Sequence, residues 1–85
     1  MAYQIIYKRF LQKLFKLLDY LRSEWGDVVT DKFIQELRAR LTTLSERPYI
    51  GAPSTSVKYV RSILITRQNR MFYRIKGEVI EVINM

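Results

Sequence analysis

Hydrophobic residues follow two different spacings along the chain, helical in the first half and strand-like in the second. Residues 3–7 (YQIIY) are aromatic and β-branched, which predicts a short first strand. From Lys8 onward the apolar positions recur at helical spacing, at Phe10, Leu14, Leu17, Leu18, Leu21 and Trp25. We expect Gly26 to end this helix as its C′ residue and Asp27 to cap the next one.

A second helical pattern follows directly. Its apolar face consists of Phe33, Ile34, Leu37, Leu41 and Leu44. The helix is expected to stop before Pro48, because proline pushes the preceding Arg47 out of the helical region. Two helices joined by so short a turn must lie antiparallel, so the pattern predicts a helical hairpin.

The remainder of the chain has the pattern of β-strands. After a loop at residues 48–56, strands are predicted at Val57–Arg67, Met71–Lys76 and Val79–Met85, with turns at residues 68–69 and 77–78. No helix separates these strands, which favours a three-stranded antiparallel meander. We therefore expect one α+β domain over residues 1–85, in which an N-terminal strand and an antiparallel helical hairpin pack on a small antiparallel sheet.

Composition limits the chemistry that this domain performs. The chain has 85 residues, of which 48% are hydrophobic, so it has room for one core and is not globally disordered. It contains neither cysteine nor histidine, so disulfides, imidazole catalysis and the usual metal sites are excluded, and we expect no cofactor. The start resembles no signal peptide, and no apolar stretch is long enough to span a bilayer. We expect a cytoplasmic protein without membrane contact.

The net charge is +7, and the excess lies in the predicted sheet. Between residues 57 and 76 the chain has no acidic residue, and its cations there are Lys58, Arg61, Arg67, Arg70, Arg74 and Lys76. Such a stretch predicts an anionic partner, either nucleic acid or an acidic protein. The alternative is a solvated sheet face, on which Lys and Arg prevent pairing with other chains.

Alternation assigns the side chains of the second meander strand to two faces. The face expected to be buried holds Met71, Tyr73 and Ile75, and the opposite face holds Phe72, Arg74 and Lys76. An aromatic ring beside two cations suits phosphate contact and base stacking.

Arg61 and two tyrosines need a separate assignment. Arg61 has the parity of Ile63 and Ile65, so it lies at the edge of a buried row unless a β-bulge intervenes. The chain has six tyrosines, and most are expected in the core or in an interface. Tyr59 and Tyr73 are the two that we consider as site residues.

Several short motifs follow one another in an order typical of one family. In the helical half they are Tyr20-Leu21, Trp25-Gly26, Phe33…Leu37 and Leu44…Pro48…Gly51. In the sheet they are Val60-Arg61-Ser62-Ile63, Met71-Phe72-Tyr73-Arg74-Ile75 and Val79-Ile80-Glu81-Val82-Ile83. Over nearly the whole chain this order resembles the toxins of the RelE/ParE superfamily, from bacterial type II toxin–antitoxin systems, and it is closer to the ParE-like branch.

The resemblance implies the toxin of a plasmid stabilisation (addiction) module, silenced by a cognate acidic antitoxin. ParE-like members inhibit DNA gyrase by binding, which makes gyrase the implied target. The residues expected to contact nucleic acid or the target are Lys58, Arg61, Arg67, Arg70, Phe72, Arg74 and Lys76. Leu11 and Phe15 widen the apolar arc of the first helix beyond one packing face, so with Trp25 they are expected to contact the antitoxin. In the absence of antitoxin, two copies of the chain could instead associate through this apolar helical surface and form a homodimer.

The resemblance leaves two alternatives open. RelE-like members are ribosome-dependent endoribonucleases that cleave mRNA without a metal, and in that case the implied catalytic residues are Arg61, Arg74 and Tyr73. Relatives usually continue beyond the last strand into a tail that is partly catalytic in this branch, whereas this sequence ends at Met85. The second alternative is a nucleic-acid-binding module without catalysis. Whether the chain is an enzyme therefore stays open.

Overall fold

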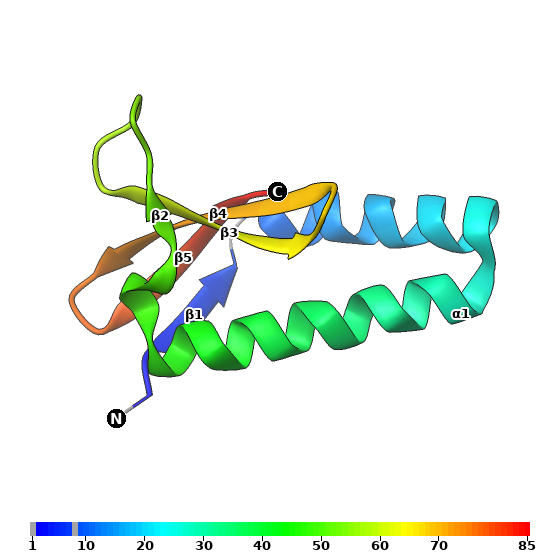
Figure 1. Ribbon diagram of the computed structural model, residues 1–85, viewed down its shortest axis with the longest axis horizontal. Coiled ribbons are helices and arrows are strands. Elements are labelled where there is room, and N and C mark those ends of the chain that lie inside the picture. Colours follow the sequence, from blue (N-terminus) through cyan, green and yellow to red (C-terminus); the bar gives the residue numbers. More distant parts are fainter. Residues whose placement is uncertain (1, 8) are drawn as a thin grey trace.

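A computed structural model describes residues 2–7 and 9–85 and has the expected α+β architecture (Figure 1). The elements are β1 (Gln4–Tyr7), α1 (Phe10–Glu46), the short 3-10 helix η1 (Pro48–Ile50), β2 (Ala52–Pro53), β3 (Val60–Thr66), β4 (Asn69–Lys76) and β5 (Val79–Asn84). Lys8, the first residue of the predicted helical pattern, lies outside the described residues, and α1 begins at Phe10. The helix contacts β1, β3 and β5.

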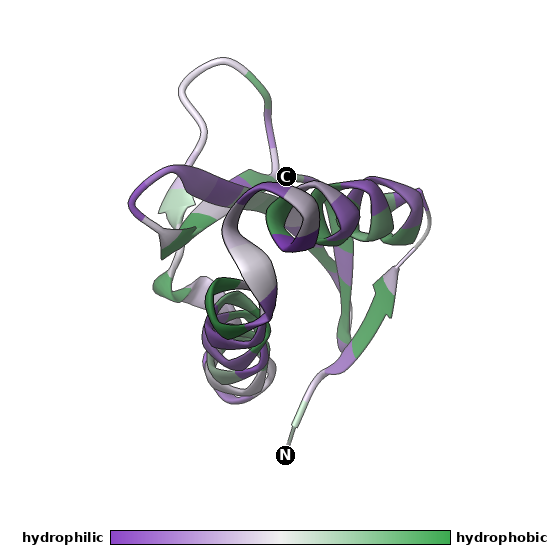
Figure 2. Ribbon diagram, turned by 90° about the vertical axis from the view of Figure 1, so that its right-hand side faces the viewer, coloured by the Kyte–Doolittle hydropathy of each residue, from purple (hydrophilic) through white to green (hydrophobic). Residues whose placement is uncertain are grey.

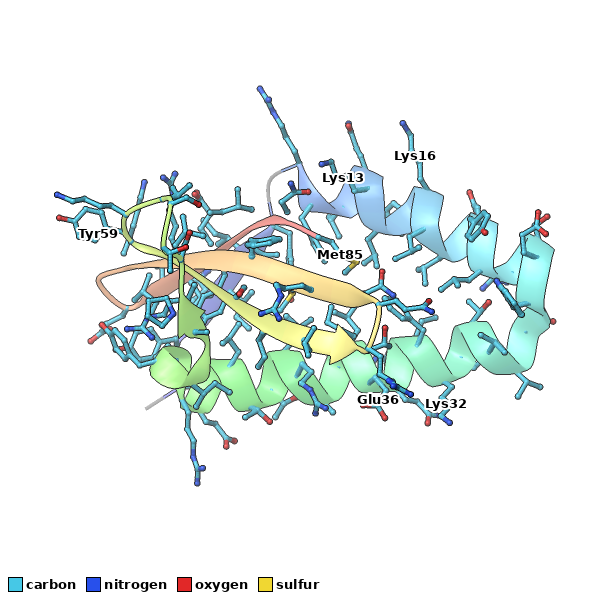
Figure 3. The ribbon with its side chains drawn as sticks, turned by 45° about the horizontal axis from the view of Figure 1, so that its top comes forward. Lys13, Lys16, Lys32, Glu36, Tyr59 and Met85 are labelled. Atoms are coloured by element: carbon cyan, nitrogen blue, oxygen red, sulfur yellow. The ribbon has the colours of Figure 1, made fainter. Side chains whose placement is uncertain are left out.

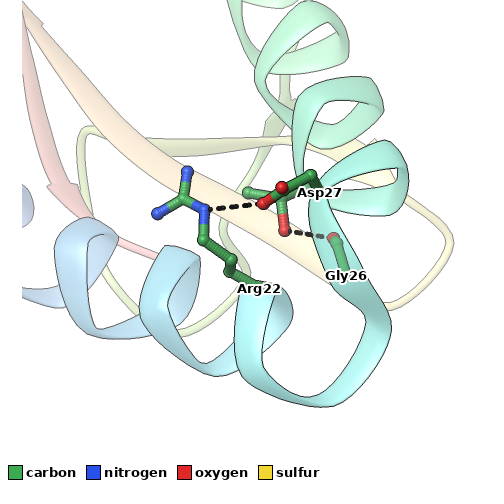
Figure 4. Close-up of polar contacts among 4 residues, drawn as sticks. Arg22, Gly26 and Asp27 are labelled. Carbon is green, nitrogen blue, oxygen red and sulfur yellow. Dashed lines mark hydrogen bonds and ion pairs between the residues drawn. The ribbon is translucent and has the colours of Figure 1, made fainter.

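The helical segment α1 changes direction at Gly26. This residue has φ 86° and ψ 178°, a combination that is essentially restricted to glycine. The Thr30 hydroxyl donates a 2.9 Å hydrogen bond to the Gly26 carbonyl oxygen, and Arg22 pairs with Asp27 at 3.2 Å beside the bend (Figure 4). The two arms, residues 10–25 and 27–46, run in opposite directions (Figure 1). The predicted pair of helices is thus one helical segment interrupted at a single residue.

The five strands form one mixed sheet in the order β1-β5-β4-β3-β2. Strands β3, β4 and β5 pair antiparallel as the predicted meander. However, β1 pairs with β5 in parallel, with Ile5 opposite Ile80, so the prediction of a wholly antiparallel sheet is wrong. The direction of β1 depends on a partner more than seventy residues away, which the alternation within residues 3–7 does not encode. In addition, the predicted loop contains the edge strand β2, which pairs with β3.

The strand β3 begins later than its alternation predicts, at Val60 instead of Val57. The Ser54 hydroxyl oxygen accepts hydrogen bonds from the backbone N–H groups of Ser56 and Val57, at 3.2 and 3.0 Å, which closes a turn. Tyr59 then adopts φ 64°, outside the range of strand residues. Residues 54–59 therefore form a loop supported by its own side chains.

The core lies between α1 and the face of the sheet that α1 covers. Its buried apolar side chains are Phe10, Phe33, Leu37, Leu44, Ile65, Met71, Tyr73, Ile80 and Val82. Figure 2 looks along the two arms, each of which carries hydrophobic and hydrophilic residues around its circumference, as expected for a helix with one buried side. Within the described residues, no helix combines the length and apolarity that crossing a membrane requires.

Candidate functional site

The strand β4 divides its side chains between two faces as its alternation predicts. Met71 and Tyr73 are fully buried in the core. The opposite side is called the outer face, and it holds Arg70, Phe72, Arg74 and Lys76 of β4 beside Ser62 and Leu64 of β3. The structure therefore places a partly buried aromatic ring among cations, away from the core.

Two arginines of the outer face have polar partners. Arg74 Nε donates to Glu81 Oε1 across the strands at 2.5 Å, and this carboxylate is almost completely buried. Arg70 Nη1 donates to the Ser62 hydroxyl oxygen at 2.9 Å. Glu81 offsets the charge of Arg74, whereas a hydroxyl leaves the charge of Arg70 uncompensated. The positive potential of this face therefore comes mainly from Arg70 and Lys76, both of which are exposed.

The other predicted cations do not join this face in one patch. Lys58 precedes β3 and Arg67 follows it in the β3–β4 turn, so the two lie at opposite ends of the strand. Both are exposed. The set of cations predicted from sequence is therefore divided among the outer face, the turn and the loop before β3.

Arg61 lies at the edge of the buried row, which decides between the two orientations predicted for it. It is opposite Tyr73, and the register shift of β3 occurs later, between Leu64 and Thr66. Arg61 Nη1 donates to the carbonyl oxygens of Gly51 at 2.7 Å and Tyr49 at 3.2 Å. Its guanidinium carbon is 5.1 Å from the centre of the Tyr49 ring. These contacts fix Arg61 against the η1–β2 segment.

The phenol of Tyr73 has a structural role. It is fully buried, donates to the Pro48 carbonyl oxygen at 2.7 Å and accepts from the Gly51 backbone N–H at 3.0 Å. Burial raises the pKa of the Tyr73 hydroxyl above its usual 10.0, opposed by the Gly51 hydrogen bond and the charge of Arg61. A neutral, doubly hydrogen-bonded phenol holds the η1–β2 segment on the sheet.

The three residues implied for catalysis therefore do not converge. Arg61 shares the core side of the sheet with Tyr73, whereas Arg74 is on the outer face. The Tyr73 hydroxyl lies in the core, and both of its hydrogen bonds are made to backbone groups. The two arginines therefore approach from different faces of the sheet.

Replacing Tyr73 with phenylalanine is expected to lower the free energy of unfolding by about 2 kcal/mol, because the buried Gly51 N–H loses its acceptor.

The raised pKa of Tyr73 also makes the free energy of unfolding of the wild type depend on pH. Native Tyr73 keeps its proton where the unfolded chain has lost it, so its contribution is complete below about pH 10 and falls at higher pH. Urea unfolding at about pH 8 and about pH 10.5 measures both effects. An equal loss of stability at high pH in both proteins would contradict this role.

The helical surface predicted to contact an antitoxin is exposed. Phe15 and Trp25 expose 60% and 64% of their surface, and Leu11 is exposed as well. Trp25 borders a groove of about 510 Å³ between the bend of α1 and the β3–β4 turn, which is also lined by Leu17, Tyr20, Leu21, Val29, Gln68 and Asn69. Apolar side chains exposed in this number indicate a surface that another molecule covers.

Sequence reasoning missed Tyr49. The Arg61 guanidinium lies over its ring, Tyr49 is mostly exposed, and it lines a pocket together with Tyr59. The one local indication is its position directly after Pro48, in the loop that links the helix to the sheet. Arg61 is twelve residues further along the chain, and periodicity gives no information about a contact between a loop and a strand.

Comparison with known families and structures identifies the group to which this arrangement belongs. A family described as ParE toxin of type II toxin-antitoxin system, parDE, matches residues 5–84. The chain belongs to the ParE toxin family. It is thus the toxin component of a type II toxin–antitoxin system, and the resemblance to the ParE-like branch is confirmed.

A solved structure titled "Chromosomal ParDE TA system from P. aeruginosa" is similar to this ParE toxin, with a TM-score of 0.76 and 20% sequence identity. The match covers 95% of this chain and 90% of that one, which shows a shared fold. No curated protein matches the sequence significantly. Within residues 2–7 and 9–85, no group of three or more Asp and Glu side chains is placed to hold a metal ion.

Proposed function

We propose that this ParE toxin arrests bacterial growth in the cytoplasm by binding DNA gyrase, without catalysing a reaction. The family match over residues 5–84 carries the proposal. The geometry favours binding over RNA cleavage, because Arg61 and Arg74 lie on opposite faces of the sheet and Tyr73 is buried. Proton transfer requires groups within hydrogen-bond reach of one reacting atom, and these three residues do not provide it.

The outer face supplies a surface for the target. Phe72 is partly buried between Arg70 and Arg74, and Lys76 is exposed at the end of β4. An aromatic ring and arginines at the centre of a contact surface are the side chains that contribute most to protein binding energy. The uncompensated charge of Arg70 and Lys76 suits an acidic patch of gyrase or the DNA that gyrase holds.

A cognate acidic antitoxin is the second partner in this proposal. Leu11, Phe15 and Trp25 offer it an apolar surface on the first arm of α1. Lys16 follows Phe15 on the same arm and is exposed, whereas Lys13 donates to Asn84 Oδ1 at 2.6 Å (Figure 3). An acidic helix or extended segment laid along this arm would bury the apolar side chains and meet the charge of Lys16.

Induced expression in bacterial cells tests the proposed function. We expect growth arrest in which DNA-damage signalling precedes any fall in translation, and we expect the acidic protein encoded beside the gene to restore growth. If translation stops first and mRNA is cut inside ribosome-bound codons, the chain is a ribosome-dependent endoribonuclease and the gyrase proposal is wrong. Cells that grow normally would point to a nucleic-acid-binding module instead.

Reversing two charges of the outer face is expected to weaken target binding. The double variant Arg70→Glu, Lys76→Glu should lose about 30-fold in affinity for gyrase, at roughly 1 kcal/mol for each exposed charge. Its thermal stability should change little, because both side chains are exposed. The matched control is the double variant Lys32→Glu, Arg38→Glu on the exposed side of α1, which changes the net charge by the same amount. An equal loss of affinity in the control would assign the effect to overall charge and contradict the placement of the target on this face.

A further inference from the structure

A pocket of about 300 Å³ lies where the segment after α1 meets the start of β3. Its lining residues are Tyr49, Pro53, Ser54, Tyr59, Val60, Arg61 and Ile75. The wall thus combines two phenol rings and aliphatic side chains with one guanidinium, and none of its lining residues is acidic. This volume lies at the lower end of the range for small-ligand pockets, which is suitable for one flat ring with a short anionic substituent.

Arg61 is held in a fixed orientation at this pocket. Its Nη1 hydrogens are used by the carbonyl oxygens of Gly51 and Tyr49, and its guanidinium lies over the Tyr49 ring. Among the residues described, its Nη2 and Nε groups have no acceptor. An arginine that is oriented in advance and retains N–H groups in a fork geometry is suited to phosphate oxygens, because less side-chain entropy is lost on binding.

Tyr59 is presented by a backbone conformation that is unfavourable for a bulky residue. It has φ 64°, and the residue is 84% exposed at the end of the 54–59 loop, where its side chain points away from the sheet (Figure 3). The Ser54 hydroxyl stabilises this loop through the N–H groups of Ser56 and Val57. No contact of the exposed ring offsets the strain within the described residues, which indicates that the conformation serves a contact with another molecule.

We propose that this pocket binds one nucleotide of a single-stranded nucleic acid, with the base against Tyr59 and Tyr49 and the phosphate on Arg61. Any base can stack on an aromatic ring, because every base has a π-face. The exposed Lys58 beside Tyr59 adds a contact for the neighbouring phosphate. An acidic protein segment would match the cations but leaves both phenol rings unused. The site is separate from the outer face and does not depend on gyrase binding.

Fluorescence anisotropy with purified toxin tests this site. The probes are a labelled single strand of about 12 nucleotides, as DNA and as RNA, and the DNA duplex of the same sequence. The single strand is expected to bind more tightly than the duplex. Tyr59→Asn should weaken single-strand binding about tenfold, because the stacked ring is lost, while duplex binding stays the same. Asparagine tolerates positive φ, so the Tm of this variant should equal or exceed that of the wild type.

The control variant is Tyr20→Ala, which removes another exposed tyrosine from the helical surface and should leave oligonucleotide binding unchanged. An equal loss for single strand and duplex in Tyr59→Asn would assign the effect to general phosphate attraction and overturn the proposal. It would also be overturned if single-strand binding were unaffected while antitoxin binding was lost. The assay contains no gyrase, so its outcome is independent of whether the toxin inhibits that enzyme.

Discussion

Replacing Gly51 with alanine is expected to lower the free energy of unfolding by about 3 kcal/mol. A Cβ atom at this position would clash with the Tyr73 hydroxyl oxygen and would lie 2.8 Å from the Ser62 carbonyl oxygen. The Tyr73 ring is buried and the Ser62 atom belongs to the backbone, so neither moves easily. The backbone of Gly51, with φ −71°, suits any residue, and the cost therefore comes from close approach alone. Urea unfolding measures the change.

The matched control for this variant is Gly77→Ala. Gly77 has φ 59° and nothing within 4 Å of the added Cβ, so the substitution costs only backbone strain, about 1 kcal/mol. The Gly51 variant should also displace Tyr49 and release Arg61, since Tyr49 belongs to the η1–β2 segment and Arg61 is bound to it. Equal destabilisation by the two substitutions would show that the packing of Tyr73 against Gly51 does not hold this segment.

Replacing Gly26 with alanine is expected to destabilise the monomer by about 2 kcal/mol and to produce a dimer that exchanges helical arms. Gly26 has φ 86° and ψ 178°, which alanine adopts only with strain. Alanine is the strongest helix former, and both flanking segments are helical. A helical residue 26 would join residues 10–46 into one straight helix, so the first arm would pack on the sheet of a second copy. Size-exclusion chromatography with light scattering measures the mass of the product.

Ser23→Ala provides the control, because it changes an exposed helical position three residues before the bend. This variant should remain monomeric, with the stability of the wild type. A monomeric Gly26→Ala protein of wild-type stability would mean that the bend is imposed by the packing of the arms instead of by the conformation of residue 26.

Local features of the sequence predicted much of this fold. Gly26 and Pro48 mark the bend and the end of the helix because each acts through its own backbone. The alternation in β4 correctly placed Met71 and Tyr73 in the core. In contrast, the parallel pairing of β1 with β5 depends on distant segments, and the start of β3 is shifted by a turn that the Ser54 side chain closes. The alternation of polar and apolar residues within a strand encodes neither its distant partner strand nor a turn that is closed by a side chain.

The candidate site was predictable in composition but not in arrangement. The excess of cations in the sheet is visible in the sequence, and so is the face on which Arg74 lies. Its pairing with Glu81 depends on the register of β4 and β5. Likewise, the orientation of Arg61 depends on carbonyl groups of a loop that is ten or more residues away. These tertiary contacts place the nuclease candidates on different faces, and they favour a toxin that acts by binding.

A gyrase supercoiling assay with purified toxin tests this account most directly, alongside cell-free translation at the same toxin concentration. We predict that the toxin blocks supercoiling of relaxed plasmid while translation continues, and that premixing with the cognate antitoxin restores supercoiling. The Arg70→Glu, Lys76→Glu variant should need about 30 times more protein for the same inhibition. Full supercoiling at saturating toxin, together with arrested translation, would contradict the account.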